Sequence, residues 1–123
     1  MKKHILLVDD DPGIRFALAL KLRGAGYEVS EATDGQEAVD WFKDRSADLV
    51  VMDVGMPRKD GYVAAGELHA APATQQVPIL FLTAQNFALP SDVAPVVRRH
   101  GFLTKPFSPR DVVATVASLL AEA

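Results

Sequence analysis

The sequence contains no cysteine. A disulfide scaffold, a thiolate metal site and a cysteine nucleophile are therefore excluded, and the absence fits a reducing compartment. Long apolar runs are also missing, because no stretch approaches the roughly 18 residues that a membrane-spanning helix requires. The apolar run near the N-terminus, Ile5 to Val8, is too short for a signal peptide and stops at three aspartates. We therefore expect a soluble protein that resides in the cytoplasm.

Basic charge is scarce as well. The 123 residues include 13 Lys and Arg against 16 Asp and Glu, a formal net charge of −3. There is no basic stripe of the kind that binds a phosphate backbone, so direct nucleic-acid binding is disfavoured. The acidic excess lies in the first 61 residues, which hold twelve acidic and nine basic side chains. Three of these carboxylates, Asp9, Asp10 and Asp11, are consecutive.

The remaining composition is that of one globular domain. Apolar residues make up 49% and charged residues 24% of the chain, which is average for soluble globular proteins. A chain of this length buries about two-thirds of its unfolded surface, which is enough for one core. The sequence has no internal repeat, linker or low-complexity segment, so residues 1–123 are predicted to form a single domain.

Short apolar runs alternate with segments of helical periodicity along the whole chain. Five strands are expected, at residues 5–8, 27–32, 48–52, 77–82 and 102–104. The run at 77–82 is the most apolar and should be a central strand. The run at 27–32 is more polar and should lie near an edge of the sheet.

A helix is expected after each strand. The clearest cap signals are Asp11-Pro12 before the first helix and Ser108-Pro109-x-Asp111 before the last. Thr33-x-x-Gln36 resembles a capping box before the second helix, and a third helix should end at about Leu68. The fourth helix is expected at 91–99, kept short and irregular by two nearby prolines.

Five such units predict an α/β protein whose five-stranded parallel sheet has helices on both faces. In open sheets of this kind, ligands bind beyond the carboxyl ends of the strands. The first strand brings Asp9 and Asp10 to that edge, the third brings Asp53, the fourth Thr83 and the fifth Lys105. The second strand contributes no obvious functional residue. Three carboxylates, a hydroxyl and an ammonium group are thus predicted to meet at one edge.

Carboxylates at such short range repel one another and raise each other's pKa unless a cation lies between them. A hard divalent cation such as Mg²⁺ resolves the repulsion. A metal among carboxylates, with Lys105 and Thr83 opposite, suits phosphoryl transfer, because the cations neutralise phosphoryl oxygens and the hydroxyl hydrogen-bonds to one. One of the carboxylates could itself be the nucleophile and form an aspartyl phosphate.

With these residues the chain resembles the receiver domain of two-component response regulators over essentially its full length. The matching segments are Val8-Asp9-Asp10-Asp11, Asp53-Val54-Gly55-Met56-Pro57 with Asp60-Gly61, Leu82-Thr83-Ala84 and Lys105-Pro106-Phe107. Each motif alone is weak, but all of them occur in order and at the family's spacing. The resemblance implies a flavodoxin-like, doubly wound fold with strand order 2-1-3-4-5. It also implies a signalling phosphoprotein that catalyses only its own phosphorylation and dephosphorylation.

The resemblance assigns roles to individual residues. Asp53 matches the aspartate that accepts a phosphoryl group from a sensor histidine kinase or a phosphotransfer protein in a phosphorelay. Asp10, Asp53 and the backbone carbonyl of Gly55 match the ligands of Mg²⁺ or Mn²⁺, and Asp9 would act on the ion mainly through water. Lys105 matches the lysine that pairs with the acceptor carboxylate and then with the phosphate.

Two further residues match the family's switch. Thr83 corresponds to the hydroxyl that moves toward the phosphate, and Phe102 to the switch aromatic, here without a tyrosine hydroxyl. The surface of the fourth helix, fifth strand and last helix should then change and bind an unidentified downstream protein or a second copy. The Lys105-Pro106 bond is expected to be cis. Arg98-Arg99 replaces the small residues usual before the fifth strand.

Each of these residues alone has an ordinary structural interpretation as a cap, a turn residue or a solvated side chain. Other functions are also open: a receiver-like docking module that is independent of phosphorylation, an aspartyl-nucleophile phosphatase, or a flavin-binding domain. The phosphatase is disfavoured because Gly55 stands where a second catalytic aspartate is typical, and the flavin domain because three anions follow the first strand. His4, His69 and His100 lack the spacing of metal ligands and should lie at the surface or at strand edges.

Overall fold

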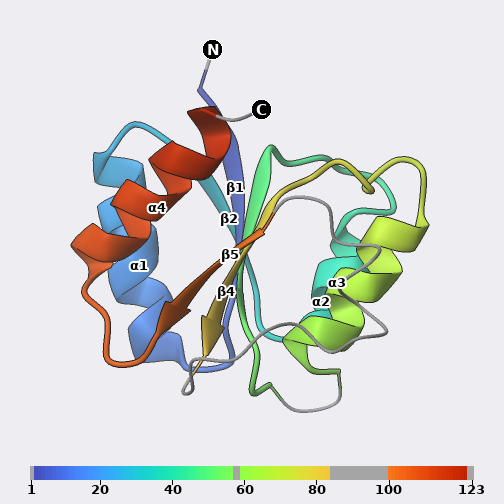
Figure 1. Ribbon diagram of the computed structural model, residues 1–123, viewed down its shortest axis with the longest axis horizontal. Helices are drawn as coiled ribbons and strands as arrows, with labels where there is room; N and C mark the ends of the chain where they lie inside the picture. The colour runs from blue at the N-terminus through green and yellow to red at the C-terminus, as the bar shows by residue number, and fades with distance from the viewer. Residues whose placement is uncertain (1, 57–58, 84–99, 122–123) are drawn as a thin grey trace.

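The computed structural model describes residues 2–56, 59–83 and 100–121. A five-stranded parallel sheet has the order β2-β1-β3-β4-β5 (Figure 1). Its strands are β1 (His4–Val8), β2 (Glu28–Ala32), β3 (Leu49–Asp53), β4 (Ile79–Thr83) and β5 (His100–Thr104). The expected fold class and strand order are therefore confirmed. The strand expected at 77–82 is interior, as predicted, although β3 stands in the middle of the sheet.

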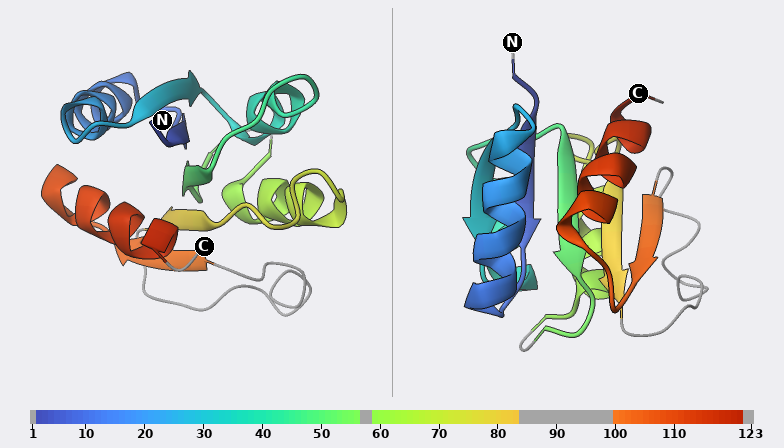
Figure 2. Two further views of the ribbon diagram at one scale, coloured as in Figure 1. Left: turned by 90° about the horizontal axis from the view of Figure 1, so that it is seen from above. Right: turned by 90° about the vertical axis from the view of Figure 1, so that its left-hand side faces the viewer.

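Helices cover both faces of this sheet. Helices α1 (Pro12–Gly24) and α4 (Pro109–Ala121) lie on one face, and α2 (Gly35–Trp41) and α3 (Gly61–Ala70) lie on the other (Figure 2). None of the described helices is long and apolar enough to cross a membrane. The label α4 denotes the last helix of the chain. The helix expected at 91–99, with its two arginines, lies outside the described residues.

The sheet separates two hydrophobic clusters. Side chains of successive strand residues point to opposite faces, so Leu6, Val50 and Phe81 pack toward α2 and α3, whereas Leu7 and Val51 pack toward α1 and α4. Every residue of β3 and β4 is buried. This is the pattern of strands covered on both faces. The buried strands provide a rigid base for the residues that follow them.

The predicted caps of the first and last helices are confirmed. The Asp11 carboxylate accepts hydrogen bonds from the backbone N–H groups of Gly13 at 2.9 Å and Ile14 at 3.2 Å. At α4, the backbone N–H of Asp111 donates to Ser108 Oγ at 3.2 Å, and the backbone N–H of Ser108 donates to Asp111 Oδ2 at 3.1 Å. This reciprocal pair is a capping box that fixes the first turn after β5.

The capping box predicted before the second helix is wrong by one residue. The N-cap of α2 is Asp34, whose carboxylate accepts a 2.8 Å hydrogen bond from the backbone N–H of Glu37. The Glu37 side chain reaches back to the N–H and hydroxyl of Thr33, while Gln36 bonds to Asp40 instead. Thr33 and Asp34 are both suitable N-cap residues, and the Asp34 carboxylate occupies the N-cap position of α2.

The three histidines differ in their environments. His4 is partly buried on β1, where its ring contacts Trp41 edge-on at 5.5 Å and its Nε2 lies 2.7 Å from Ser30 Oγ. His100 begins the edge strand β5, as expected. His69 is buried, so the surface position expected for it is wrong. Its Nδ1 lies 3.1 Å from the Ala65 carbonyl, and burial lowers the pKa of its ring.

The substitution Gly35→Ala should destabilise the fold. A Cβ at Gly35 would lie 2.4 Å from the Lys59 carbonyl oxygen and 3.0 Å from Ala64 Cβ, so α2 would have to move away from the loop before α3. We expect the free energy of unfolding to fall by about 1–3 kcal/mol, as for other overpacked sites. Urea unfolding measures this loss.

The control substitution is Gly24→Ala. Apart from its chain neighbours and its own helical turn, no described residue has an atom within 4 Å of a Cβ built at Gly24, at the end of α1. Alanine is the better helix former, so this variant should be as stable as the natural protein or more stable by up to about 1 kcal/mol. Equal unfolding curves for the two alanine variants would contradict the close packing at Gly35.

Candidate functional site

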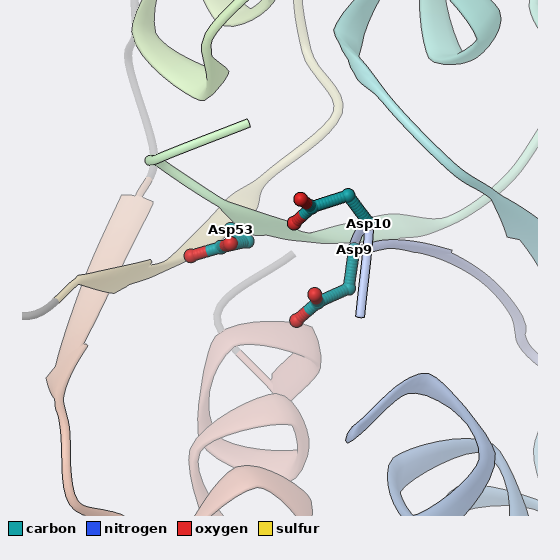
Figure 3. A group of neighbouring side chains, drawn as sticks. All are labelled: Asp9, Asp10 and Asp53. Atoms are coloured by element: carbon teal, nitrogen blue, oxygen red, sulfur yellow. The ribbon is translucent and has the colours of Figure 1, made fainter. Parts of the chain in front are cut away.

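Three carboxylates lie together beyond the carboxyl ends of β1 and β3. These strands are neighbours, and Val8 pairs with Met52, so Asp9 and Asp53 follow at the same level of the sheet. One oxygen from each of Asp9, Asp10 and Asp53 lies within 4.8 Å of the others (Figure 3). We call these three residues the acidic cluster. It is the arrangement predicted from the strand ends.

The members of the acidic cluster differ in burial. Asp9 is 1% and Asp53 4% exposed, whereas Asp10 is exposed to solvent. Asp9 Oδ1 accepts a 2.9 Å hydrogen bond from the backbone N–H of Asp11, but Asp9 Oδ2 is buried and has no hydrogen-bond partner among the described residues. Burial raises the pKa of Asp9 to about 6, with a further contribution from the nearby charge of Asp53.

Lys105 brings a positive charge to the cluster from the other side. Its Nζ lies 3.1 Å from Asp53 Oδ1, and the Asp53 side chain is almost fully buried. The backbone N–H of Lys105 donates a 2.7 Å hydrogen bond to the Thr83 carbonyl. The bond between Lys105 and Pro106 is cis, as expected. The ammonium group therefore neutralises part of the charge that the three carboxylates accumulate.

Thr83 and Phe102 lie on the side of the site formed by β4 and β5. Thr83 is the last residue of β4 and is 3% exposed. Phe102 is partly buried on β5 and stacks on Phe81, with ring centroids 5.4 Å apart and an interplanar angle of 26°. Phe81 and Thr83 are two residues apart on one strand and share a face of the sheet. The two predicted switch residues are thus on adjoining strands.

The loop after β3 is held by Gly61 and the Val54 carbonyl. That carbonyl accepts hydrogen bonds from the N–H groups of Met56 and Gly61. A Cβ at Gly61 would lie 2.6 Å from the Asp53 carbonyl oxygen, so only glycine permits this close approach of α3 to β3. Gly55 is exposed in the same loop, and a Cβ there would meet open space.

Two residues that were not predicted from the sequence, Arg15 and Glu31, contact the acidic cluster or one another. Arg15 Nη1 donates a 2.7 Å hydrogen bond to the backbone carbonyl of Asp9, and its Nε lies 3.1 Å from Glu31 Oε1. No functional residue was predicted on the second strand. Glu31 on β2 is nevertheless linked to the acidic cluster, because it pairs with Arg15 and Arg15 contacts Asp9. The only signal in the sequence is the spacing of Arg15, one helical turn after the Asp11 cap.

The donor atoms of the acidic cluster fit a hard divalent cation. Mg²⁺ prefers carboxylate and carbonyl oxygens and retains several waters, and the exposed Asp10 leaves one side open to solvent. No group in the described part of the chain hydrogen-bonds to the buried Asp9 Oδ2, and a proton or a cation, directly or through water, would satisfy it. Within the described residues this is the one group of three or more potential ligands.

Fold and site together define a class. A flavodoxin-like parallel sheet carries an acidic cluster, a lysine and a threonine at the carboxyl ends of its strands, and that combination is typical of receiver domains. The family model for the response regulator receiver domain matches residues 5–117. The chain belongs to this family.

Individual relatives agree with this assignment. The chain is 40% identical over 119 residues to the probable transcriptional regulator ycf27 of Cyanophora paradoxa. The aligned region covers 97% of this chain and 48% of that relative. The chemotaxis response regulator CheY4 of Vibrio cholerae matches with a TM-score of 0.87 at 30% identity, over 97% of this chain and 99% of that one.

A further structure is the receiver domain of the sensor histidine kinase PA1611 from Pseudomonas aeruginosa, solved with a magnesium ion in its active-site cleft. It matches with a TM-score of 0.85 at 29% identity, over 98% of this chain and 99% of that one. The chain spans about half the length of the curated relatives it matches.

In the absence of divalent cations, Asp9→Asn should stabilise the protein above pH 6. The folded protein holds the Asp9 proton up to about pH 6, whereas the ordinary pKa of an aspartate carboxyl is 3.8. The stability that the protonated group contributes is therefore lost as the pH rises from about 4 through 6. The variant should gain on the order of 2 kcal/mol at pH 8 and little at pH 4.

Urea unfolding at both pH values, in a chelating buffer, measures this difference. Asp44→Asn is the control, because the Asp44 side chain is 81% exposed and its removal should change stability little at either pH. A wild-type protein that is more stable than Asp9→Asn at pH 8 would contradict the burial cost assigned to Asp9.

Proposed function

We propose that residues 1–123 form one receiver domain that accepts a phosphoryl group on Asp53 from a sensor histidine kinase or a phosphotransfer protein. The observation that carries this proposal is the position of the Asp53 carboxylate. It is buried, lies beside two further carboxylates and contacts the Lys105 ammonium at 3.1 Å. A nucleophilic carboxylate flanked by cation sites suits phosphoryl transfer.

The reaction would depend on Mg²⁺ or Mn²⁺. Asp10, Asp53 and the backbone carbonyl of Gly55 would bind the ion, and Asp9 would act on it mainly through water. The bound ion would neutralise the carboxylates and the phosphoryl oxygens. The magnesium ion in the related PA1611 receiver domain supports this assignment. So does the unpartnered Asp9 Oδ2, which a cation or its water would satisfy.

The chemical step needs little from the protein beyond position and charge. A carboxylate oxygen of Asp53 attacks the phosphorus of a phosphohistidine, an O–P bond forms and the N–P bond breaks. The leaving imidazole keeps the electron pair and takes a proton from water. Lys105 stabilises the negative charge on the transferred oxygens, and the Thr83 hydroxyl hydrogen-bonds to one of them.

Phosphorylation would be transmitted through Thr83 and Phe102. A hydroxyl drawn toward the new phosphate vacates space at the end of β4, next to the stacked rings of Phe81 and Phe102. A shift of Phe102 would change the surface at the β5 edge of the sheet, which with α4 belongs to the predicted output face; the helix expected at 91–99, its third part, lies outside the described residues. We propose that a downstream protein, or a second copy of the chain, binds this face. Binding that persists unchanged in Asp53→Ala would favour a docking module instead.

The protein should gain one phosphoryl group when incubated with acetyl phosphate and Mg²⁺. Intact-mass spectrometry detects the gain, which should disappear in Asp53→Asn and in excess chelator. Lys105→Met should react about a hundredfold more slowly, as when one charge-stabilising donor is lost.

Asp60→Asn is the matched control for the nucleophile. Asp60 caps α3 through the backbone N–H of Val63 at 2.9 Å, a role that asparagine also fills, and it is not part of the acidic cluster. This variant should be phosphorylated normally. Undiminished phosphorylation of Asp53→Asn would refute Asp53 as the acceptor.

Thr83→Ala should separate phosphorylation from the structural response. Loss of one hydrogen bond of about 1 kcal/mol should slow phosphorylation about fivefold, but the NMR signals of the Phe102 ring should no longer change on phosphorylation. Thr104→Ala is the control, since Thr104 pairs with Thr83 in the sheet register and has no assigned role. An unaltered Phe102 response in Thr83→Ala would remove Thr83 from the switch.

A further inference from the structure

Arg15 connects helix α1 to the backbone of the acidic cluster. Its Nη1 donates to the Asp9 carbonyl at 2.7 Å, while its Nε donates to Glu31 Oε1 at 3.1 Å. The Arg15 side chain is 18% exposed, so this contact is largely shielded from solvent. A guanidinium group presents several donors in one rigid plane and stays charged at any ordinary pH.

The Asp9 carbonyl belongs to the peptide unit that leads into Asp10. Asp10 is exposed, and none of the residues in the described ranges hydrogen-bonds to its carboxylate. Its direction therefore depends on the backbone before it. The other polar atoms of Asp9 are bonded as well: its N–H donates to the Ala32 carbonyl and its Oδ1 accepts from Asp11. Arg15 completes this set, and within the described ranges only Asp9 Oδ2 is left without a hydrogen-bond partner.

Glu31 holds Arg15 in this position. Glu31 Oε1 pairs with Arg15, and its other oxygen, Oε2, lies 3.4 Å from Arg23 Nη2. Glu31 stands opposite Leu7 in the register of β1 and β2, two residues before Asp9. Arg23 uses the same nitrogen to contact the Val29 carbonyl at the edge of the sheet. The two arginines thus share one carboxylate, but only Arg15 contacts the backbone of the acidic cluster.

We infer that Arg15 is a positioning residue for the metal-binding function of the acidic cluster. By holding the Asp9–Asp10 peptide unit, it directs the Asp10 carboxylate toward Asp53, and Glu31 fixes Arg15 for this task. The inference rests on the proposed function only in that the acidic cluster binds Mg²⁺. It concerns how tightly the ion is held, independently of any phosphoryl transfer.

Arg15→Gln changes Mg²⁺ affinity in two opposite ways, through the loss of its charge and through the loss of its contact with Asp9. Removal of a positive charge near three carboxylates, taken alone, strengthens the attraction for a cation. Loss of the Asp9 contact releases Asp10 and weakens binding, as residues that orient metal ligands typically contribute 10–100-fold to affinity. Because Glu31 already neutralises much of the Arg15 charge at 3.1 Å, the positional effect should dominate. We expect about tenfold weaker Mg²⁺ binding.

Arg23→Gln provides a matched control. It removes the same charge from the same carboxylate and leaves the Asp9 contact intact, so its Mg²⁺ affinity should equal or slightly exceed that of the wild type. The double variant with Arg15→Gln and Glu31→Gln keeps the net charge unchanged. It should bind Mg²⁺ about as weakly as Arg15→Gln, because position and not charge is altered. Arg15→Lys, which keeps the charge without the fork of donors, should recover only part of the affinity.

Isothermal titration of the full chain with MgCl₂ at pH 7.5, without a phosphodonor, measures these affinities. NMR of the Asp10 and Asp11 amides should show altered signals in Arg15→Gln before Mg²⁺ is added, and circular dichroism melting without metal identifies any variant that unfolds. If Arg15→Gln fails to fold, the comparison of Arg15→Lys with Arg23→Gln decides.

Three outcomes overturn the inference. The first is an Arg15→Gln variant that binds Mg²⁺ as tightly as the wild type or more tightly. The second is equal weakening in Arg23→Gln. The third is a wild-type protein that binds no Mg²⁺, which would also overturn the metal assignment. A wild type that binds Mg²⁺ normally but accepts no phosphoryl group would refute the proposed function and leave the role of Arg15 intact.

Discussion

Repulsion between Asp9, Asp10 and Asp53 is the constraint around which the rest of the site is arranged. The register of β1 against β3 makes their proximity unavoidable. Two of the three are buried, where the surrounding protein screens their charge poorly. Lys105 approaches Asp53 from one side, and Arg15 holds the backbone of Asp9 on the other. Asp9 Oδ2 still has no hydrogen-bond partner among the described residues, so these two cations do not satisfy every oxygen of the cluster.

The sheet is what keeps the repelling groups in place. All residues of β3 and β4 are buried between the two helical layers, so neither strand can move without disturbing a packed core. Gly61 lets the loop after β3 close directly over the Asp53 backbone. The electrostatic cost of the cluster is therefore met by hydrophobic packing elsewhere in the domain, and its carboxylates are held close together by the rigid strands that precede them.

Much of this arrangement followed from the sequence, and the failures have physical causes. The rule that ligands bind at the carboxyl ends of parallel strands brought Asp9, Asp10 and Asp53 together, and the resemblance to receiver domains added the strand order. The cap of α2 was misplaced because adjacent Thr33 and Asp34 compete for it. The burial of His69 depends on packing at the end of α3, which local periodicity does not report. The functional roles of Asp9, Asp10 and Asp53 remain predictions.

Arg15 and Glu31 could not be predicted for a different reason, since they are 16 residues apart and meet only because β2 pairs with β1. The sheet creates another coupling of this kind between Lys105 and Thr83. The Lys105 N–H donates a hydrogen bond to the Thr83 carbonyl at 2.7 Å, so the backbones of the ammonium-bearing residue and the hydroxyl-bearing residue are directly joined. If Asp53 is phosphorylated as we propose, a displacement of either residue would be passed to the other through this hydrogen bond, and the domain would have one concerted response where two separate side chains would have given two.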